Sequence, residues 1–232
     1  MTALDNLILK YGAQAFEKQV HFADIIGDIN PVWQMDIPNG KIRIGEVSFS
    51  AQLIGTESEA TETWLWAWAN EQSNLPEDVL EIAHKMKAYG EEHQIPELTN
   101  GNTIPVDDRV SGNRFGLLAC ALFDGNAYFR APYDGGALYL AICDDNFPPD
   151  ERPIIMRVMA SFPQFIQNMR IFDHKTTLKH YAEYHNLKTS LTREEGIVTL
   201  TAKQDDGASF TAKFDARDRL TQLQSTLKED EL

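Results

Sequence analysis

The sequence lacks the features that would place the chain in a membrane or outside the cell. No apolar run approaches the roughly 18 residues that a membrane-spanning helix needs. The N-terminal stretch, MTALDNLILKYG, has neither the basic segment nor the cleavage site of a secretory signal. The only cysteines are Cys120 and Cys143, and two reduced thiols are typical of a cytosolic protein. We therefore expect a cytoplasmic location and no membrane partner.

The chain also lacks catalytic and cofactor-binding motifs. It contains no nucleophile elbow, phosphate loop or dinucleotide fingerprint, so no cofactor is expected and catalysis is disfavoured but left open. The histidines form no zinc motif, and the closely spaced His174, His180 and His185 fall on different faces of a helix, so no metal site is expected. Cys120 lies in an apolar stretch without a neighbouring base, which favours a buried thiol over a nucleophile.

Positive charge is scarce, with 21 Lys and Arg residues against 35 Asp and Glu residues and a net charge of −14. This charge repels the phosphates of nucleic acids and anionic membrane surfaces, so neither is an expected partner. Residues 55–97 hold ten acidic residues against Lys85 and Lys87. Such a region is typical of a solvated, acidic surface that keeps a protein soluble. The alternative is a docking surface for a basic protein partner, whose approach it would accelerate.

Three of the four tryptophans fall at alternate positions within residues 61–70. In an extended strand Trp64, Trp66 and Trp68 share one face, while small apolar residues share the other. A strand that is apolar on both faces is typical of the interior of a sheet, covered by helices. The simpler interpretation is therefore a core strand. The alternative is an aromatic wall that lines a ligand groove or a partner surface.

The tryptophan stretch resembles a family of uncharacterised bacterial proteins. Members carry a W-x-W-x-W-N-type strand, matched here by WLWAWAN, and then a helix that closes on Tyr-Gly, matched by Ala88-Tyr89-Gly90. Later matches are residues 115–123 and 127–133, and the resemblance covers roughly residues 4–142. The family is a domain of unknown function, so the resemblance implies a fold and a bacterial origin but no activity.

Arg130 is a further candidate for binding. In the predicted strand 127–132 it shares a face with Tyr128. An arginine beside aromatic rings can bind a carboxylate or stack on a ring, and the alternative is a simple pair with a surface acid. The candidate ligand- or partner-binding residues are therefore Trp64, Trp66, Trp68 and Arg130.

Periodicity predicts an α+β fold in which helices pack on antiparallel meanders. A helix over residues 2–24, capped by Thr2 and Asp5, precedes a three-stranded meander that ends in the tryptophan strand. Within this meander, Asn39-Gly40 predicts a hairpin, Gly45-Glu46 a bulge or bend, and residues 55–60 a turn. The elements expected next are a helix ending at Gly90, a loop over 91–106, a helix from Asp107 or Asp108 to Phe123, and a hairpin over 127–142.

The proline-rich residues 147–153 predict a boundary between domains at 1–146 and 153–232, although the two parts can also pack as one unit. The second part begins with a helical segment over 154–172, interrupted or kinked at Pro163, and a helix capped by Asp173. A meander follows over 198–203 and 209–214, and residues 219–224 suit a strand or a helix. Helix-then-meander thus occurs in both parts and suggests a repeat.

The sequence predicts a bacterial, cytoplasmic binding protein without catalysis, acting by immunity-type or other protein docking. The alternative is a small-ligand-binding protein or enzyme with a pocket walled by the tryptophan strand. The sequence does not indicate the oligomeric state.

Overall fold

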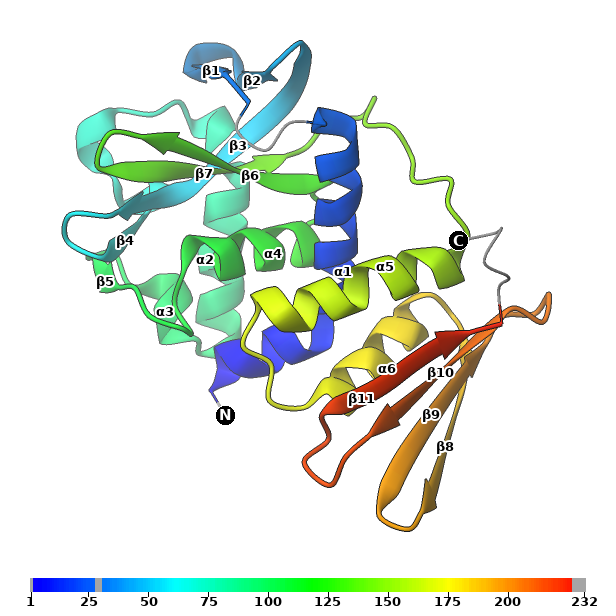
Figure 1. Ribbon diagram of the computed structural model, residues 1–232. Coiled ribbons are helices and arrows are strands. Elements are labelled where there is room, and N and C mark those ends of the chain that lie inside the picture. The colour runs from blue at the N-terminus through cyan, green and yellow to red at the C-terminus, as the bar shows by residue number, and fades with distance from the viewer. Residues whose placement is uncertain (1, 28–30, 227–232) are drawn as a thin grey trace. The chain divides into compact units, whose positions relative to one another are not determined.

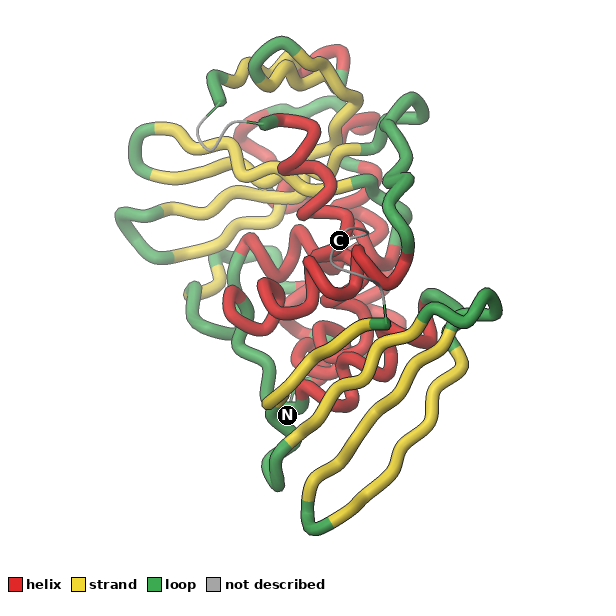
Figure 2. Tube along the Cα trace, turned by 45° about the vertical axis from the view of Figure 1, so that its right-hand side comes forward, coloured by secondary structure: helices red, strands yellow, loops and turns green. Residues whose placement is uncertain are grey.

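The computed structural model describes residues 2–27 and 31–226. Helices and two antiparallel sheets make up the described chain, which confirms the α+β class (Figures 1 and 2). The chain divides into two compact units, one formed by residues 1–5 and 18–149 and the other by residues 6–17 and 150–232. The first helix, α1, therefore contributes residues to both units.

Helix α1, Ala3–Ile26, has the predicted N-terminal cap. The Thr2 hydroxyl accepts a hydrogen bond from the Asp5 amide at 3.1 Å, and the Asp5 carboxylate accepts one from the Thr2 amide at 3.0 Å. The helix ends at Gly27, whose φ of 68° is the left-handed conformation that glycine adopts at low cost.

A sheet of seven strands forms the centre of the first unit (Figure 1). Its strands are β1 (Trp33–Asp36), β2 (Lys41–Ile44), β3 (Val47–Ser58), β4 (Thr63–Trp66), β5 (Ile104–Pro105), β6 (Ala127–Tyr133) and β7 (Gly136–Ile142). The long strand β3 pairs with β2 along its first half and with β4 and β7 along its second half. The predicted hairpin over 127–142 is confirmed as β6 and β7.

The structure differs from two predictions in this sheet. A tight turn between two strands lies at Gly45-Glu46, where a bulge or bend was predicted, with Ile44 opposite Val47, so β1 to β4 form a four-stranded meander. Strand β3 also runs through Gly55 to Ser58, so the turn predicted over residues 55–60 begins only at Glu59. The missing side chain of Gly55 is needed there, because a Cβ would lie 2.3 Å from the ring of Trp64.

The tryptophan stretch is a strand only as far as Trp66. Strand β4 lies between β3 and β5, as expected of an interior strand. The chain then turns into the short 3₁₀ helix η2, Ala67–Ala69, which carries Trp68. The prediction that all three tryptophans share one strand face is therefore wrong for Trp68.

Three α-helices of the first unit lie between β4 and β6 in the chain: α2 (Glu81–His93), α3 (Pro96–Thr99) and α4 (Gly112–Leu122). Helix α2 passes through Gly90, and Gln94 in the left-handed conformation caps it instead. Helix α4 begins at Gly112, after the N-cap Ser111, rather than near residue 107. The Asp107 carboxylate instead accepts hydrogen bonds from the amides of Arg109 and Val110 and forms a turn. Helix α3 and strand β5 lie where a loop was predicted.

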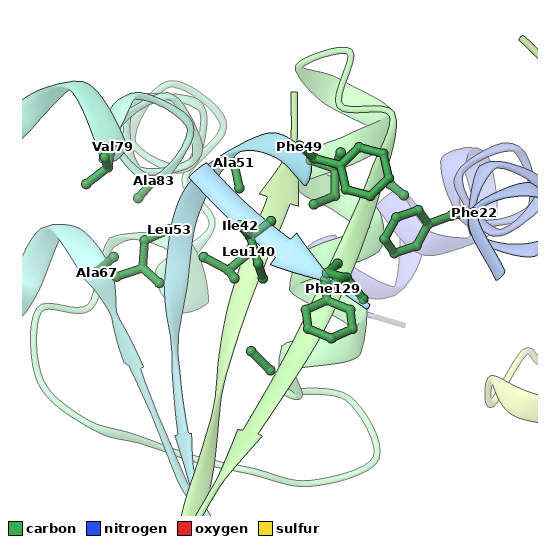
Figure 3. Close-up of a cluster of buried hydrophobic side chains, with 14 of the residues drawn as sticks. Phe22, Ile42, Phe49, Ala51, Leu53, Ala67, Val79, Ala83, Phe129 and Leu140 are labelled. Carbon is green, nitrogen blue, oxygen red and sulfur yellow. The ribbon is translucent and has the colours of Figure 1, made fainter. Parts of the chain in front are cut away.

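One core cluster of the first unit joins α1 to the sheet and to α2 (Figure 3). The ring of Phe22 packs edge-on against Phe49 and Phe129, with centroids 5.7 and 6.4 Å apart. Toward α2 the cluster continues through Leu53 and Ala67 to Ala83 (Figure 3).

The second unit contains α5 (Ile154–Asn168), α6 (His174–Tyr184) and a four-stranded meander. The strands are β8 (Lys188–Glu194), β9 (Ile197–Lys203), β10 (Ser209–Phe214) and β11 (Leu220–Ser225), in the order β11-β10-β9-β8. Residues 220–225 are thus a strand. Helix α5 passes through Pro163 without a break, so the prediction of two helices is wrong. Strand β8 was not predicted from the sequence.

Both units show a helix followed by a four-stranded meander, as the sequence pattern suggested. In the first unit α1 precedes β1 to β4, and in the second unit α6 precedes β8 to β11 (Figure 1). In the second unit Leu200, Phe210 and Phe214 are buried on one face of the sheet, while Lys203 and Lys213 are exposed on the other.

Candidate functional site

Trp64 and Trp66 are core residues with no exposed surface. Their rings meet edge-on at 5.3 Å, and both pack against Phe115 of α4, at 5.1 and 4.6 Å. The Trp66 indole donates a hydrogen bond to the Glu97 carbonyl at 2.9 Å, whereas Trp64 Nε1 has no partner among the described residues. A ligand could reach either ring only after the surrounding side chains moved.

Trp68 is half-buried and lies apart from this pair on η2. The Lys87 ammonium lies 4.5 Å from the centre of its ring, a cation–π contact. This contact places one of the two basic residues of segment 55–97 against an aromatic surface.

Arg130 pairs with a surface acid, which was the simpler of its two interpretations. Its guanidinium lies 2.7 Å from Glu59, and the two side chains are 38% and 59% exposed. Burial lowers the pKa of Arg130, but its contacts with Tyr139 and Glu59 outweigh burial and raise it. The Tyr139 ring also packs against Trp64 at 5.5 Å, so Tyr139 stands between Arg130 and Trp64. Arg130 and Trp64 therefore both contact Tyr139, but they do not line a common pocket.

A separate cavity of about 430 Å³ opens in the first unit, and we call it the apolar pocket. Its apolar wall consists of Met35, Ile37, Leu53, Leu75, Val79 and Leu138. Four polar side chains also face it, from Thr56, Asn70, Ser73 and Tyr133. Neither the three tryptophans nor Arg130 belong to this lining.

A bulge in β3 makes the pocket wall possible. The pairing of β3 with β7 shifts between Leu53 and Gly55, so that Leu53 faces Leu140 and Thr56 faces Leu138. Because side chains alternate along a regular strand, residues 53 and 56 would otherwise point to opposite faces. The bulge places both on the pocket side.

Exposed carboxylates lie close in sequence to the residues that line the pocket, and we call them the acidic rim. Each is within two residues in sequence of a residue that lines the pocket. The acidic rim consists of Asp36, Glu71, Glu77, Asp78 and Asp134. Glu71, Glu77 and Asp78 belong to the acidic region that is visible in the sequence. The pocket itself was not predicted, because its lining residues come from distant parts of the chain.

The second unit contains a buried polar cluster around Glu17, which was not predicted from the sequence. The Glu17 carboxylate accepts hydrogen bonds from Arg157 at 3.0 Å and from the Tyr181 hydroxyl, and His185 Nε2 lies 2.7 Å from it. The Ser161 hydroxyl lies 2.8 Å from that of Tyr181. Burial, together with the Glu17 charge, raises the pKa of Tyr181 well above its ordinary value, so this hydroxyl stays a donor. Ser161 and Tyr181 are about 1% exposed, so neither hydroxyl offers a surface to a substrate.

Neither cysteine thiol is ionised in its surroundings. Burial raises the pKa of Cys143 to about 11 and raises that of Cys120 further, so both thiols are protonated at neutral pH. Within residues 2–27 and 31–226, no group of three His, Cys, Asp or Glu side chains is placed to hold a metal ion. The expected contact between His180 and Glu183 is present, at 3.4 Å.

Among the described residues, no helix is both long enough and apolar enough to cross a membrane. Neither the curated proteins nor the solved structures contain a match to the chain. A family model does match residues 5–145, which is more than half of the sequence. Over this segment the chain belongs to the family described as "Family of unknown function (DUF6882)".

Proposed function

We propose that the chain is a non-catalytic binding protein that docks a basic protein partner, as an immunity-type protein does. The observation that carries this proposal is the apolar pocket with its acidic rim. An apolar cavity of about 430 Å³ can hold one large side chain of a partner, which is the usual anchor of a protein interface. The surrounding carboxylates favour a partner whose anchor is flanked by lysine or arginine.

The proposal places the protein in the cytoplasm of a bacterium. Cys120 and Cys143 are both free, which supports a reducing compartment. The resemblance of the tryptophan stretch supports the bacterial origin.

Charge-matched peptides test the docking proposal. One peptide carries a central leucine between lysines, and the other carries the same leucine between glutamates. We expect the lysine peptide to bind more tightly at low salt and to lose this advantage at high salt, because salt screens exposed charges. Fluorescence polarisation measures both affinities. Equal binding of the two peptides would remove the charge argument.

A pair of charge reversals locates the binding surface. Glu77→Lys with Asp78→Lys changes the acidic rim, whereas Glu91→Lys with Glu92→Lys changes exposed acids of α2 outside it by the same net charge. We expect the first pair to weaken binding of the lysine peptide about tenfold and the second pair to change its affinity little. If both pairs weaken binding equally, only the overall charge matters and the pocket is not the docking site.

A second candidate function is the binding of a small apolar ligand in the same pocket. Its volume lies within the usual range of ligand sites, and Thr56, Asn70, Ser73 and Tyr133 could orient a ligand. Ser73→Trp would fill the pocket, while Gln72→Trp adds the same ring to a neighbouring exposed position outside the lining. A small ligand would raise the melting temperature of the Gln72→Trp variant but not that of Ser73→Trp. Reversal of the acidic rim would leave an uncharged ligand unaffected, which distinguishes this function from docking.

A further inference from the structure

Strand β8 is an exposed edge of the sheet in the second unit. It pairs with β9 on one side and is the outermost strand of the order β11-β10-β9-β8 (Figure 1). All of its side chains are exposed apart from the half-buried Thr189. An edge strand presents a row of backbone donors and acceptors that can pair with another strand.

The turn after β8 determines which of its backbone groups face this edge. Strands β8 and β9 are joined by Glu195 and Gly196, with φ of 50° and 82°, and Glu194 lies opposite Ile197. In such a two-residue hairpin the residues beside the turn form a hydrogen-bonded pair, and every second residue repeats that pattern. The backbone N–H and C=O groups of Thr189, Leu191 and Arg193 therefore point away from β9.

The sequence of β8, KTSLTRE, is complementary to itself when reversed. If two copies of the strand run antiparallel about Leu191, each Lys188 lies opposite a Glu194, and Leu191 lies opposite its own copy. Residues that lie opposite each other in this register point to the same face of the sheet, so the side chains of each Lys188–Glu194 pair can contact each other. Charged residues on an edge usually prevent pairing, but here they attract in the symmetric register.

We propose that two copies of the chain associate through β8, antiparallel and with a two-fold axis at Leu191. The outward backbone groups of Thr189, Leu191 and Arg193 form the new ladder, and the two sheets become one. Such an interface is isologous, the commonest arrangement of a homodimer. This inference concerns the second unit and does not rest on the proposed docking function.

Two features of the strand are consistent with this partner. Leu191 is 46% exposed and lies opposite the buried Leu200 of β9, so a second Leu191 would extend the apolar face of the sheet. Lys188 currently contacts Asp205 at 2.7 Å, but the two side chains are 80% and 86% exposed. Such an exposed pair is weak and can exchange for Glu194 of a second copy.

A charge-swap series tests the register. In the Lys188→Glu variant, positions 188 and 194 would both be acidic and would face each other at each end of the interface. In the Glu194→Lys variant, both positions would be basic. We expect each variant to raise the dimer dissociation constant about tenfold or more, since two cross-strand pairs change from attraction to repulsion. Lys213→Glu changes the same charge at an exposed position of β10, two strands from the free edge, and serves as the control. Sedimentation velocity over a range of concentrations measures the constants.

Mixing the variants gives the decisive result. When Lys188→Glu and Glu194→Lys are mixed, every facing Lys–Glu position of the mixed dimer is again of opposite sign, so the mixture is expected to dimerise more tightly than either variant alone. The doubly substituted chain should also recover self-association. Wild-type protein that stays monomeric at all concentrations would overturn the proposal. So would a wild-type dimer that neither single variant weakens, and circular dichroism establishes that each variant is folded.

Discussion

Glu17 shows how a charged residue can belong to a core. Its side chain is 8% exposed, and a buried carboxylate is costly unless it is paired and hydrogen-bonded. The carboxylate is contacted by Arg157 of α5, by Tyr181 of α6 and by His185, the residue that caps the end of α6. The cluster thus attaches α1 to α5 and α6 within the second unit.

Substitution of Glu17 by glutamine should be strongly destabilising. Glutamine has about the same size, but its N–H₂ group would face one of the groups that now donate a hydrogen bond to the carboxylate. It also removes the negative charge that pairs with Arg157. We expect a loss of about 3 kcal/mol in the free energy of unfolding, measured by urea denaturation. Glu183→Gln, at a position that is 44% exposed, is the control and should change stability by less than about 0.5 kcal/mol. Similar small effects of both substitutions would show that the buried cluster contributes little.

His174 makes the second unit sensitive to acid. Its Nδ1 accepts a hydrogen bond from the Leu220 amide at 3.1 Å, and its Nε2 lies 2.9 Å from the Arg219 guanidinium. Burial and the positive charge of Arg219 lower the pKa of His174, against the raising effect of the Ile171 carbonyl and of Asp173 and Asp215. The unfolded chain therefore binds this proton more readily than the folded chain.

The stability that His174 contributes should be present above its ordinary pKa of about 6.5 and lost as the pH falls below it. His174→Asn keeps an acceptor near the Leu220 amide but cannot titrate. We expect the wild type to lose more stability than this variant between pH 7.5 and pH 5, in urea denaturation at both values. His180→Asn, which removes a histidine from a half-exposed position, should keep the wild-type pH dependence. An unchanged pH dependence in His174→Asn would refute this assignment.

At the scale of elements, Gly90 shows why a helix can require glycine away from its end. Helix α2 continues three residues beyond it. A Cβ at this position would lie 2.5 Å from Leu98 Cβ and 3.0 Å from Thr99 Cγ2, both on the short helix α3. The absence of a side chain therefore allows α2 and α3 to pack closely.

Gly90→Ala should destabilise the protein although alanine favours a helix. Alanine would gain about 1 kcal/mol in helix propensity, but overpacking against α3 costs about 1–3 kcal/mol. We expect a net loss of about 1 kcal/mol in thermal or urea unfolding. Ala88→Gly, at an exposed position two residues earlier, should lose about 1 kcal/mol from propensity alone. A stabilised Gly90→Ala variant would show that α3 moves aside easily.

Strand β10, which has one buried face, could be predicted from the sequence, and the exposed strand β8 could not. Strand β10 alternates buried Phe210, Ala212 and Phe214 with polar residues, which is a clear period of two. Strand β8 lacks such a pattern because nearly all of its side chains are exposed. Its backbone pairing with β9, rather than burial, makes it a strand, and a single sequence does not show that pairing.

The candidate site illustrates the same limit. The tryptophans of residues 61–70 are visible in the sequence as a large apolar group, and the structure places Trp64 and Trp66 in the core. The apolar pocket instead depends on the bulge between Leu53 and Gly55 and on segments from β1 to β7. Strand pairing over long separations determines which side chains meet there, and periodicity along the chain carries no information about it.

At the scale of the whole molecule, each of the two compact units is built from two separate segments of the chain. The second unit consists of residues 150–232 and of residues 6–17 from α1. Within it the rings of Phe16 and Phe165 meet at 5.6 Å, and a Cβ on Gly12 would lie 2.7 Å from the Phe165 ring. Division into domains at 1–146 and 153–232 stays a prediction, and it can be tested directly.

A fragment of residues 150–232 should fold poorly by itself, since it lacks the α1 residues that cover Phe165 and the Glu17 carboxylate that Arg157, Tyr181 and His185 contact. A peptide of residues 2–26 added in excess should restore a cooperative thermal transition and a dispersed amide NMR spectrum. The same peptide with Glu17→Ala should restore them less well, because three polar groups would then be buried without their partner. A fragment that unfolds cooperatively without the peptide, at the temperature of the intact chain, would show that α1 adds nothing to the stability of the second unit.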